Sequence, residues 1–414
     1  MVKFERFTLE NGLRVLFHED RTTPMAVVNV LYDVGARDES PEKTGFAHLF
    51  EHLMFGGSIN IPEFDAPLQM AGGENNAFTS NDITNYYDVL PANNIDTALW
   101  LESDRMLSLA FTPISLEVQR SVVIEEFKQR YLNQPYGDVW LELRPLIYRE
   151  HPYRWATIGK EIAHIEDATM EDVKGFFKRF YHPGNAILCL AGNISLEEAK
   201  QKTNHWFGDI PQGPKETRSL PKEPKQNEIR RKNIERDVPS DAFYYAFRMV
   251  DRLDVDYLTC DVISDILGRD KSARLYKKLK KELQLVSDIN AYITGSLDEG
   301  LLLISGKLNQ GVSFDQLDEA IWPIIEELKS TEIQEIELNR IMNKIRTSKA
   351  FQDQGLLNRA MALSMYELLG DANMINEESD NYAKIDPNGI KRVASFILRK
   401  ENCSILTVKA KNND

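Results

Sequence analysis

The stretch from Phe46 to Phe55 places three polar side chains in an otherwise apolar segment. On an α-helix, His48 and His52 lie about 40° apart and Glu51 falls beside them, so the three share a sector about 100° wide. A helix that is apolar around most of its circumference is buried. Two imidazoles and a carboxylate in a buried helix need partners, and a metal ion would satisfy all three at once.

These residues spell His-x-x-Glu-His, a signature of zinc peptidases. Histidines at positions i and i+4 both reach one Zn²⁺, and the neighbouring Glu51 holds a zinc-bound water as general base. Zinc lowers the pKa of that water towards about 7. The alternative is that His48 and His52 are unrelated core or surface histidines, but the burial pattern and a candidate third ligand favour the metal.

A helix predicted at Leu116–Tyr131 offers that third ligand. Glu125 points almost directly away from its apolar face, whereas Glu126 lies on the edge of that face. Gln119, two turns earlier, lies within about 20° of Glu126 on the same stripe. Glu126 is therefore the better candidate, although periodicity alone leaves open that it is an ordinary solvated residue.

Length and composition indicate a globular protein of two domains. A chain of 414 residues exceeds what one hydrophobic core usually serves. Its net charge of −14 argues against a nucleic-acid partner. The three cysteines lie far apart, without metal-site or disulfide spacing, and are predicted to be buried thiols. No run is long enough for a transmembrane segment, and the start of the chain lacks a signal core. We expect a cytoplasmic protein, or equally a periplasmic or secreted one whose leader has been removed.

The order of predicted elements suggests a duplication. Residues 211–226 carry four prolines among lysines and polar residues, which is typical of an extended linker. On both sides of it, a helix, an asparagine and a buried strand follow one another, at Thr169–Ala191 and at Pro387–Val408. We predict an α+β fold of two duplicated α/β lobes, 1–210 and 227–414, each a mostly antiparallel sheet packed with helices.

Local patterns predict the individual elements. Asn11-Gly12 between two apolar runs predicts a hairpin of Phe4–Leu9 and Leu13–Phe17. Further strands are predicted at Ala26–Val34, Gly72–Ser80, Asn85–Leu90, Asn185–Ala191, Asn227–Asp237, Ala242–Met249, Val286–Tyr292, Leu301–Lys307 and Cys403–Val408. Further helices are predicted at Phe64–Met70, Ile95–Ser108, Gly137–Tyr148, Thr169–Tyr181, Leu196–Phe207 and Tyr257–Leu267, with long helices up to Gly370.

Several motifs together resemble the pitrilysin-type zinc peptidases. They are His48–His52, the Gly72–Thr79 stretch, Asp82-x-Thr84-x-Tyr86-Tyr87 and Val122–Glu126, in the family's order and approximate spacing. The resemblance covers nearly the whole chain. It implies one Zn²⁺ per chain, with His48, His52 and Glu126 as ligands and Glu51 as catalytic base. It also implies pairing with another such subunit, as a homodimer or heterodimer, so that four lobes enclose a chamber for unfolded peptides.

The resemblance assigns a substrate-binding role to Asn76 and Ala77. Two glycines followed by β-forming residues describe an edge strand that another backbone can approach. A peptide added there would be held by main-chain hydrogen bonds, with little demand on its sequence. The alternative is an ordinary turn and strand.

Two positions depart from the family pattern. Where relatives carry a second glutamate that supports the site, this chain has Gln119, an amide that can still orient a neighbour. Where catalytic relatives carry an Arg and a Tyr that bind substrate and stabilise the oxyanion, this chain has Lys280 and Ser287. Lysine lacks the planar fork of arginine, and losing one oxyanion donor costs about 10²–10³ in rate. The surrounding lysines otherwise fit the solvated face of a helix.

Three hypotheses follow. The first is a zinc endopeptidase that hydrolyses unfolded or short peptides through a zinc-bound water activated by Glu51. The second is a non-catalytic assembly or scaffold subunit of the same fold, against which the intact set of four residues argues. The third lies between them: a zinc-bearing subunit that needs a partner carrying the Arg and Tyr pair.

Overall fold

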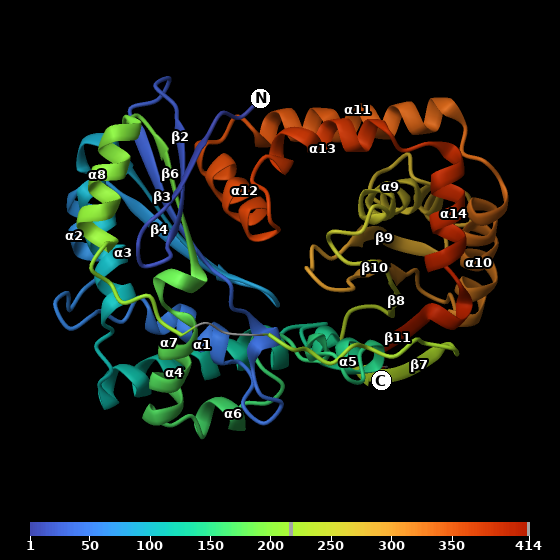
Figure 1. Ribbon diagram of the computed structural model, residues 1–414. Coiled ribbons are helices and arrows are strands. Elements are labelled where there is room, and N and C mark those ends of the chain that lie inside the picture. Colours follow the sequence, from blue (N-terminus) through green and yellow to red (C-terminus); the bar gives the residue numbers. More distant parts are fainter. Residues whose placement is uncertain (215–217, 412–414) are drawn as a thin grey trace. The chain divides into compact units, whose positions relative to one another are not determined.

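The computed structural model describes residues 1–214 and 218–411 (Figure 1). The chain forms two compact units, each built from three separate segments. Unit 1 consists of Met1–Lys128, Trp155–Pro221 and Lys349–Glu377, and unit 2 of Gln129–Arg154, Lys222–Ser348 and Glu378–Asp414. The predicted halves, 1–210 and 227–414, therefore do not coincide with the compact units. The chain does pass from unit 1 to unit 2 inside the predicted linker, between Pro221 and Lys222.

Each unit contains one mixed sheet. The sheet of unit 1 has six strands in the order β1-β2-β6-β3-β5-β4, and that of unit 2 has five, β7-β11-β8-β10-β9. Only the β2–β6 and β7–β11 pairs are parallel among the described strands; the other neighbours are antiparallel. The strands are β1 Glu5–Thr8, β2 Arg14–Glu19, β3 Met25–Tyr32, β4 Glu74–Thr79, β5 Thr84–Pro91, β6 Ala186–Gly192, β7 Arg230–Arg236, β8 Ala242–Arg248, β9 Val286–Ile293, β10 Leu301–Leu308 and β11 Cys403–Ala410.

The two sheets share one topology. If β1 is set aside, β2 to β6 of unit 1 occupy the same places, in the same order, as β7 to β11 of unit 2, including the parallel pair. The predicted fold class, two duplicated lobes with mostly antiparallel sheets, is confirmed.

Helices cover the sheets. They are α1 Phe46–Leu53, α2 Asp65–Met70, α3 Ile95–Leu107, α4 Pro113–Phe127, α5 Val139–Ile147, α6 Ala163–Glu166, α7 Met170–Phe180, α8 Leu196–Phe207, α9 Tyr257–Leu267, α10 Phe314–Ser330, α11 Glu335–Gln352, α12 Leu356–Leu368, α13 Met374–Ala383 and α14 Pro387–Ile397. Short 3₁₀ segments and two π-helical segments, η3 Lys128–Leu132 and η6 Tyr276–Glu282, complete the list. Among the described helices none is both long and apolar enough to cross a membrane.

One face of each sheet is covered by a helix from the opposite half of the chain. In unit 1, Ala360 and Leu363 of α12 pack on Leu16 and Val27 of the sheet. In unit 2, α5 buries Leu143 and Ile147 against β8, β10 and β11. An apolar sheet face must be covered to be stable, so neither half of the chain completes its own core.

The remaining face of the unit 1 sheet carries α1, α3 and α8 (Figure 1). Side chains on neighbouring strand positions point to opposite faces. Val27 and Leu31 therefore face α12, whereas Tyr86 faces the α1 side, where its ring lies 6.0 Å from that of Phe55. The α1 side of this sheet is therefore the side next to the helix that carries His48, Glu51 and His52.

The predicted hairpin is confirmed, because β1 and β2 pair antiparallel and Gly12 adopts a φ of 85° in the turn. The other predicted strands and helices lie within a few residues of their observed bounds. The largest shift is at the end of α4, which was predicted at Tyr131 and lies at Phe127. The helix begins at Pro113, because Thr112 caps it through the backbone N–H of Ser115. Helix α13 was not predicted, and the three cysteines are buried and free as predicted.

The predicted linker makes charged contacts with each unit, and residues 215–217 lie outside the described part of the chain. Arg218 pairs with Asp33 and Asp38 within unit 1. In unit 2, the carboxylate of Glu223 accepts hydrogen bonds from the backbone N–H groups of residues 149–151. Charged contacts therefore fix this proline-rich segment to each unit.

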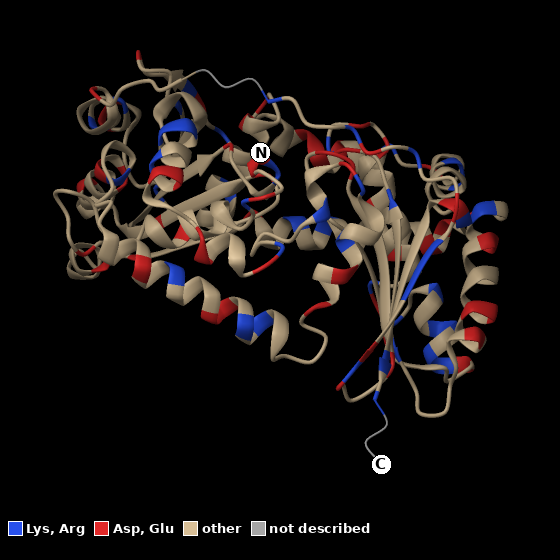
Figure 2. Ribbon diagram, turned by 90° about the horizontal axis from the view of Figure 1, so that it is seen from below, with Lys and Arg blue, Asp and Glu red and all other residues tan. Residues whose placement is uncertain are grey.

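Charged residues of both signs are interspersed along the helices (Figure 2). The sequence has 50 basic and 64 acidic residues, and these form many short-range ion pairs. Exposed pairs of this kind add little stability but favour solubility.

Candidate metal centre

Helix α1 begins at a capped turn. Gly45 has a φ of 88°, and a side chain there would collide with the backbone oxygen of Ile158. The carboxylate of Glu39 accepts hydrogen bonds from the N–H groups of Gly45 and Ala47, both at 2.9 Å. Backbone N–H groups at a helix start have no partner within the helix, so Glu39 satisfies two that would otherwise be buried and unpaired.

Glu39 is itself buried, and burial raises the pKa of its carboxyl to about 8, although the two backbone N–H groups act to lower it. A negative charge at a helix start is favourable, but removing that charge from water costs more here. The start of α1 is therefore sensitive to pH.

The rest of α1 is fixed by apolar contacts. Five of its eight residues are buried. The ring of Phe50 lies 4.9 Å from that of Phe176 and 5.1 Å from that of Tyr181, which come from α7 and the turn after it. The predicted burial of this helix is confirmed, and its polar stripe keeps partial access to solvent: the exposed side-chain fractions are 13% for His48 and 23% for His52.

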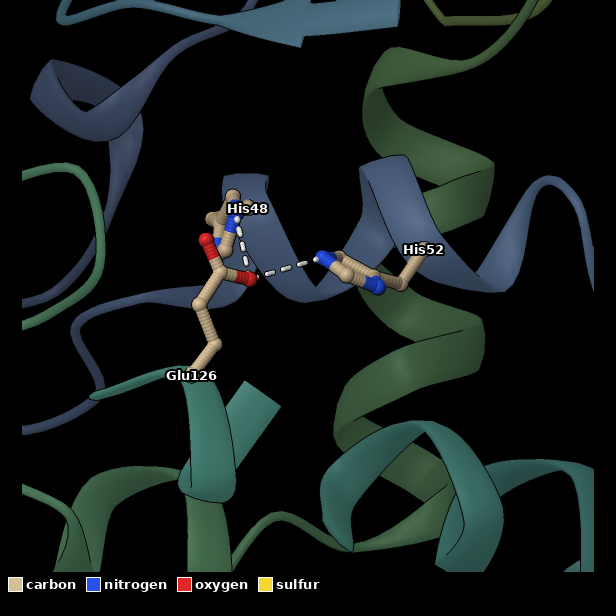
Figure 3. Close-up of side chains that lie close together, drawn as sticks. All are labelled: His48, His52 and Glu126. Carbon is tan, nitrogen blue, oxygen red and sulfur yellow. Dashed lines mark ion pairs between the residues drawn. The ribbon is translucent and has the colours of Figure 1, made fainter. Parts of the chain in front are cut away.

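Helix α4 brings Glu126 to this stripe (Figure 3). The Oε2 atom of Glu126 lies 3.6 Å from His48 Nε2 and 3.3 Å from His52 Nε2. Buried Val123 and Phe127 fix the rotation of α4. Glu125 is exposed. The structure thus places Glu126, the residue chosen from the sequence, beside the two histidines.

The three side chains fit a zinc ion. One ligand atom from each lies within 4.8 Å of the others. In a tetrahedral zinc site, bonds of about 2.0–2.2 Å place ligand atoms roughly 3.3–3.5 Å apart, close to the observed distances from Glu126 to the imidazoles. Two histidines and a carboxylate are also the ligand set of catalytic zinc sites that keep a fourth position open. Within the described residues, no other group of three such side chains is this close.

Glu51 lies on the same stripe of α1 and is held by a residue that sequence reasoning did not single out. The hydroxyl of Thr79, the last residue of β4, donates a hydrogen bond of 2.5 Å to Glu51 Oε2. The sequence signal for this contact is the alternation of β4, which puts Thr79 on the same face as Ala77. That signal becomes readable only once the position of α1 is known.

Asn76 and Ala77 lie on β4, which is an edge strand of its sheet and pairs with β5. Asn76 is exposed and Ala77 half-buried, and the Asn76 side chain accepts a hydrogen bond from the Ala77 N–H. The strand that carries these candidates thus ends at Thr79, in contact with Glu51.

The other predicted positions are Gln119, on the same helix as Glu126, and two residues of unit 2. Gln119 is half-buried on α4, with its side-chain amide beside Gly56, just after α1. In unit 2, the ammonium of Lys280 lies 5.3 Å from the ring centre of Tyr276 within η6. Ser287 is exposed on β9, and its hydroxyl donates to Lys307 O at 3.4 Å.

This two-sheet fold, with His48, His52 and Glu126 clustered beside one sheet, is the arrangement expected of a pitrilysin-type protein. Two family models match the chain. "Insulinase (Peptidase family M16)" matches residues 14–152, and "Peptidase M16 inactive domain" matches residues 167–345.

Relatives that align with most of the chain support the same family. The zinc protease PqqE of Helicobacter pylori is 31% identical over 345 residues, which are 82% of this chain and 78% of the relative. A probable mitochondrial-processing peptidase subunit beta of Arabidopsis thaliana is 25% identical over 420 residues, covering 97% of this chain and 77% of the relative. The crystal structure of a protease from Helicobacter pylori has a TM-score of 0.93 at 28% identity, covering 99% of this chain and 100% of the other. The chain belongs to the M16 peptidase family.

The buried carboxyl of Glu39 predicts a pH-dependent stability. Its pKa is raised from 4.5 to about 8 on folding, so between these values the folded chain keeps a proton that the unfolded chain releases. The stability contributed by this group is full below about 4.5 and is lost as the pH rises through about 8. In Glu39→Gln, which cannot titrate, stability relative to wild type should rise between about pH 5 and about pH 8. Urea unfolding midpoints at the two pH values measure this, and an unchanged difference would contradict it.

Replacing either of two neighbouring glutamates by glutamine tests the role of Glu126 in the proposed metal cluster. Glu126→Gln should bind zinc at least about 100-fold more weakly than wild type, since changes to residues that merely support a ligand already cost about 10- to 100-fold. Glu125→Gln, one residue away and exposed, is the matched control and should bind zinc normally. Zinc content by elemental analysis and competition with a chelator measure both. Equal affinities in the two variants would exclude Glu126 as a ligand.

Proposed function

We propose that this chain is a zinc-dependent endopeptidase that hydrolyses unfolded or short peptides, acting as the zinc-bearing subunit of a dimer that encloses its substrate. The observation that supports this most is the convergence of His48, His52 and Glu126 within 4.8 Å, with Glu51 on the same helix face. A zinc protease among the relatives supports the same reading.

The chemistry follows from the residues present. A zinc ion bound by the cluster would act as a Lewis acid and lower the pKa of a water to near 7. Glu51 would take the proton from the attacking water and return it to the amine that leaves when the peptide bond breaks. The partial exposure of the two histidines leaves this stripe of α1 accessible to a substrate.

The edge strand β4 supplies a place for the peptide. An extended peptide that pairs with β4 would be bound mainly through its backbone, which suits substrates of varied sequence. Asn76 and Ala77 lie in the middle of this strand and Thr79 at its end. A peptide docked along β4 would therefore run towards Glu51, which Thr79 contacts.

Two residues of unit 2 are the reason to propose a partner subunit. Lys280 and Ser287 stand where the pitrilysin-type resemblance expects an arginine and a tyrosine. Ser287 is exposed, and its hydroxyl is directed to a backbone oxygen of its own sheet. One relative is named as a beta subunit of a processing peptidase. We propose that a related subunit supplies the missing pair.

A non-catalytic role is the second candidate, and one observation favours it: the model that matches residues 167–345 is described as an inactive domain. That match covers the C-terminal part of the chain and leaves out α1 and α4, which hold the cluster. A protein with a purely structural role has no need for Glu51 beside three clustered ligands, so the enzymatic reading is the better supported.

Removing the base tests the enzymatic reading. Glu51→Gln keeps the shape and the hydrogen-bonding capacity of the side chain but cannot accept a proton, so peptide cleavage should fall by about 10²–10⁴-fold. Zinc content and thermal unfolding temperature should stay near the wild-type values. Cleavage of a mixture of unstructured peptides, followed by mass spectrometry, is the measurement. Wild-type turnover by the variant would refute the proposed mechanism.

Mixing experiments test the partner requirement. The chain alone should cleave peptides slowly, and adding a related subunit with an arginine and a tyrosine at the positions of Lys280 and Ser287 should raise the rate by about 10²-fold or more. Glu51→Gln mixed with the same partner is the control and should stay inactive. Full turnover by the isolated chain would show that no partner is needed.

A further inference from the structure

The contact between Thr79 and Glu51 joins a strand and a helix that are separate in the sequence. Thr79 ends strand β4, and Glu51 lies in helix α1, 28 residues earlier. The hydroxyl of Thr79 donates to Glu51 Oε2 at 2.5 Å. A bond from a neutral hydroxyl to a carboxylate is charge-assisted, and such bonds are short and roughly twice as strong as neutral ones.

The backbone of the sheet fixes the direction of the Thr79 side chain. Thr79 and Ala77 are two residues apart on β4 and therefore share a face. Ala77 pairs with Tyr86 on β5, and the Tyr86 hydroxyl donates to Phe50 O in α1 at 3.5 Å. This face of β4 is thus the α1 side. Thr79 is also β-branched, which restricts its χ1 angle, so the hydroxyl is presented with little freedom.

We propose that Thr79 is a positioning residue for the proposed general base. Its hydroxyl holds the Glu51 carboxylate in one orientation on α1. Because Thr79 lies in the same strand as Asn76 and Ala77, it also sets the base relative to a peptide docked along β4. This inference rests on the proposed function of Glu51 and extends it to the strand that would carry the substrate.

A carboxylate can still act as a base while it accepts this bond. It has two oxygens and about four acceptor sites, so one hydroxyl does not prevent proton transfer to it. The bond does limit rotation of a side chain with three rotatable torsions, and general-base catalysis depends on placing the accepting oxygen within hydrogen-bonding reach of the proton. Loss of Thr79 should therefore reduce turnover rather than substrate binding.

The test compares variants of two paired threonines. Thr79→Val keeps the branched shape and loses the hydroxyl. We expect kcat to fall about 10- to 100-fold, as for other residues that orient a catalytic group, with KM and zinc content near wild type. Thr79→Ser, which restores the hydroxyl, should recover most of the rate. The assay uses the form of the wild-type protein that cleaves peptides, alone or with its partner.

Thr84→Val is the matched control. Thr84 is the cross-strand partner of Thr79, and its buried hydroxyl donates to Val34 O at 3.0 Å. This variant loses a hydroxyl from the same strand pair without touching Glu51. It should lower the thermal unfolding temperature and leave kcat unchanged well below that temperature.

The outcomes separate this inference from the proposed function. Normal kcat in zinc-loaded Thr79→Val would overturn the positioning role, while inactivity of Glu51→Gln in the same assay would leave the proposed function standing. A loss of kcat that Thr79→Ser does not restore, or that follows a loss of zinc or of folded protein, would also overturn it. Peptide cleavage by Glu51→Gln at the wild-type rate, or an inactive wild type in both forms, would instead refute the proposed function.

Discussion

The burial of α1 is the constraint on which the site depends. Five of its eight residues are buried, so the helix has no freedom to rotate, and its polar stripe faces one direction only. Glu39 fixes its start through two backbone N–H groups, and aromatic rings from α7 fix its middle. An imidazole pair on a rigid helix would be preorganised for a metal ion, because folding has already ordered the two side chains.

The sheet side of α1 is supported by a buried charge. Arg105 of α3 is almost fully buried and pairs with Glu102. Its guanidinium lies over the rings of Phe64 and Tyr86, 4.3 and 4.4 Å from their centres, and 5.2 Å from that of Phe55, just after α1. A buried ion pair of this kind adds little net stability, because removing both charges from water costs free energy. Its effect is directional, since cation–π contacts fix the rings that pack against the end of α1 nearest His52.

The sequence predicted the local elements and the grouping of His48, His52 and Glu126 well, because both depend on short-range patterns. The spacing of His48, Glu51 and His52 places them on one face of any α-helix. The choice of Glu126 over Glu125 follows from the position of the apolar face of α4. The exchange of α5 and α12 between the two halves of the chain could not be predicted in this way, because an apolar helix face does not show which sheet it will cover. The contact of Thr79 with Glu51 was missed for the same reason, since it joins a strand end to a helix through tertiary packing.

The duplication provides an internal control for the metal-site interpretation. In unit 1 the chain runs from β3 through α1 to β4, and in unit 2 from β8 through α9 to β9, so α9 occupies the topological place of α1. Helix α9 fills that place with Val262, Ile263 and Ile266, all buried, and has no histidine. The fold therefore accepts a helix without histidines at this point. The histidines and Glu51 of α1 are therefore not required by the architecture, which supports the proposal that they serve chemistry rather than packing.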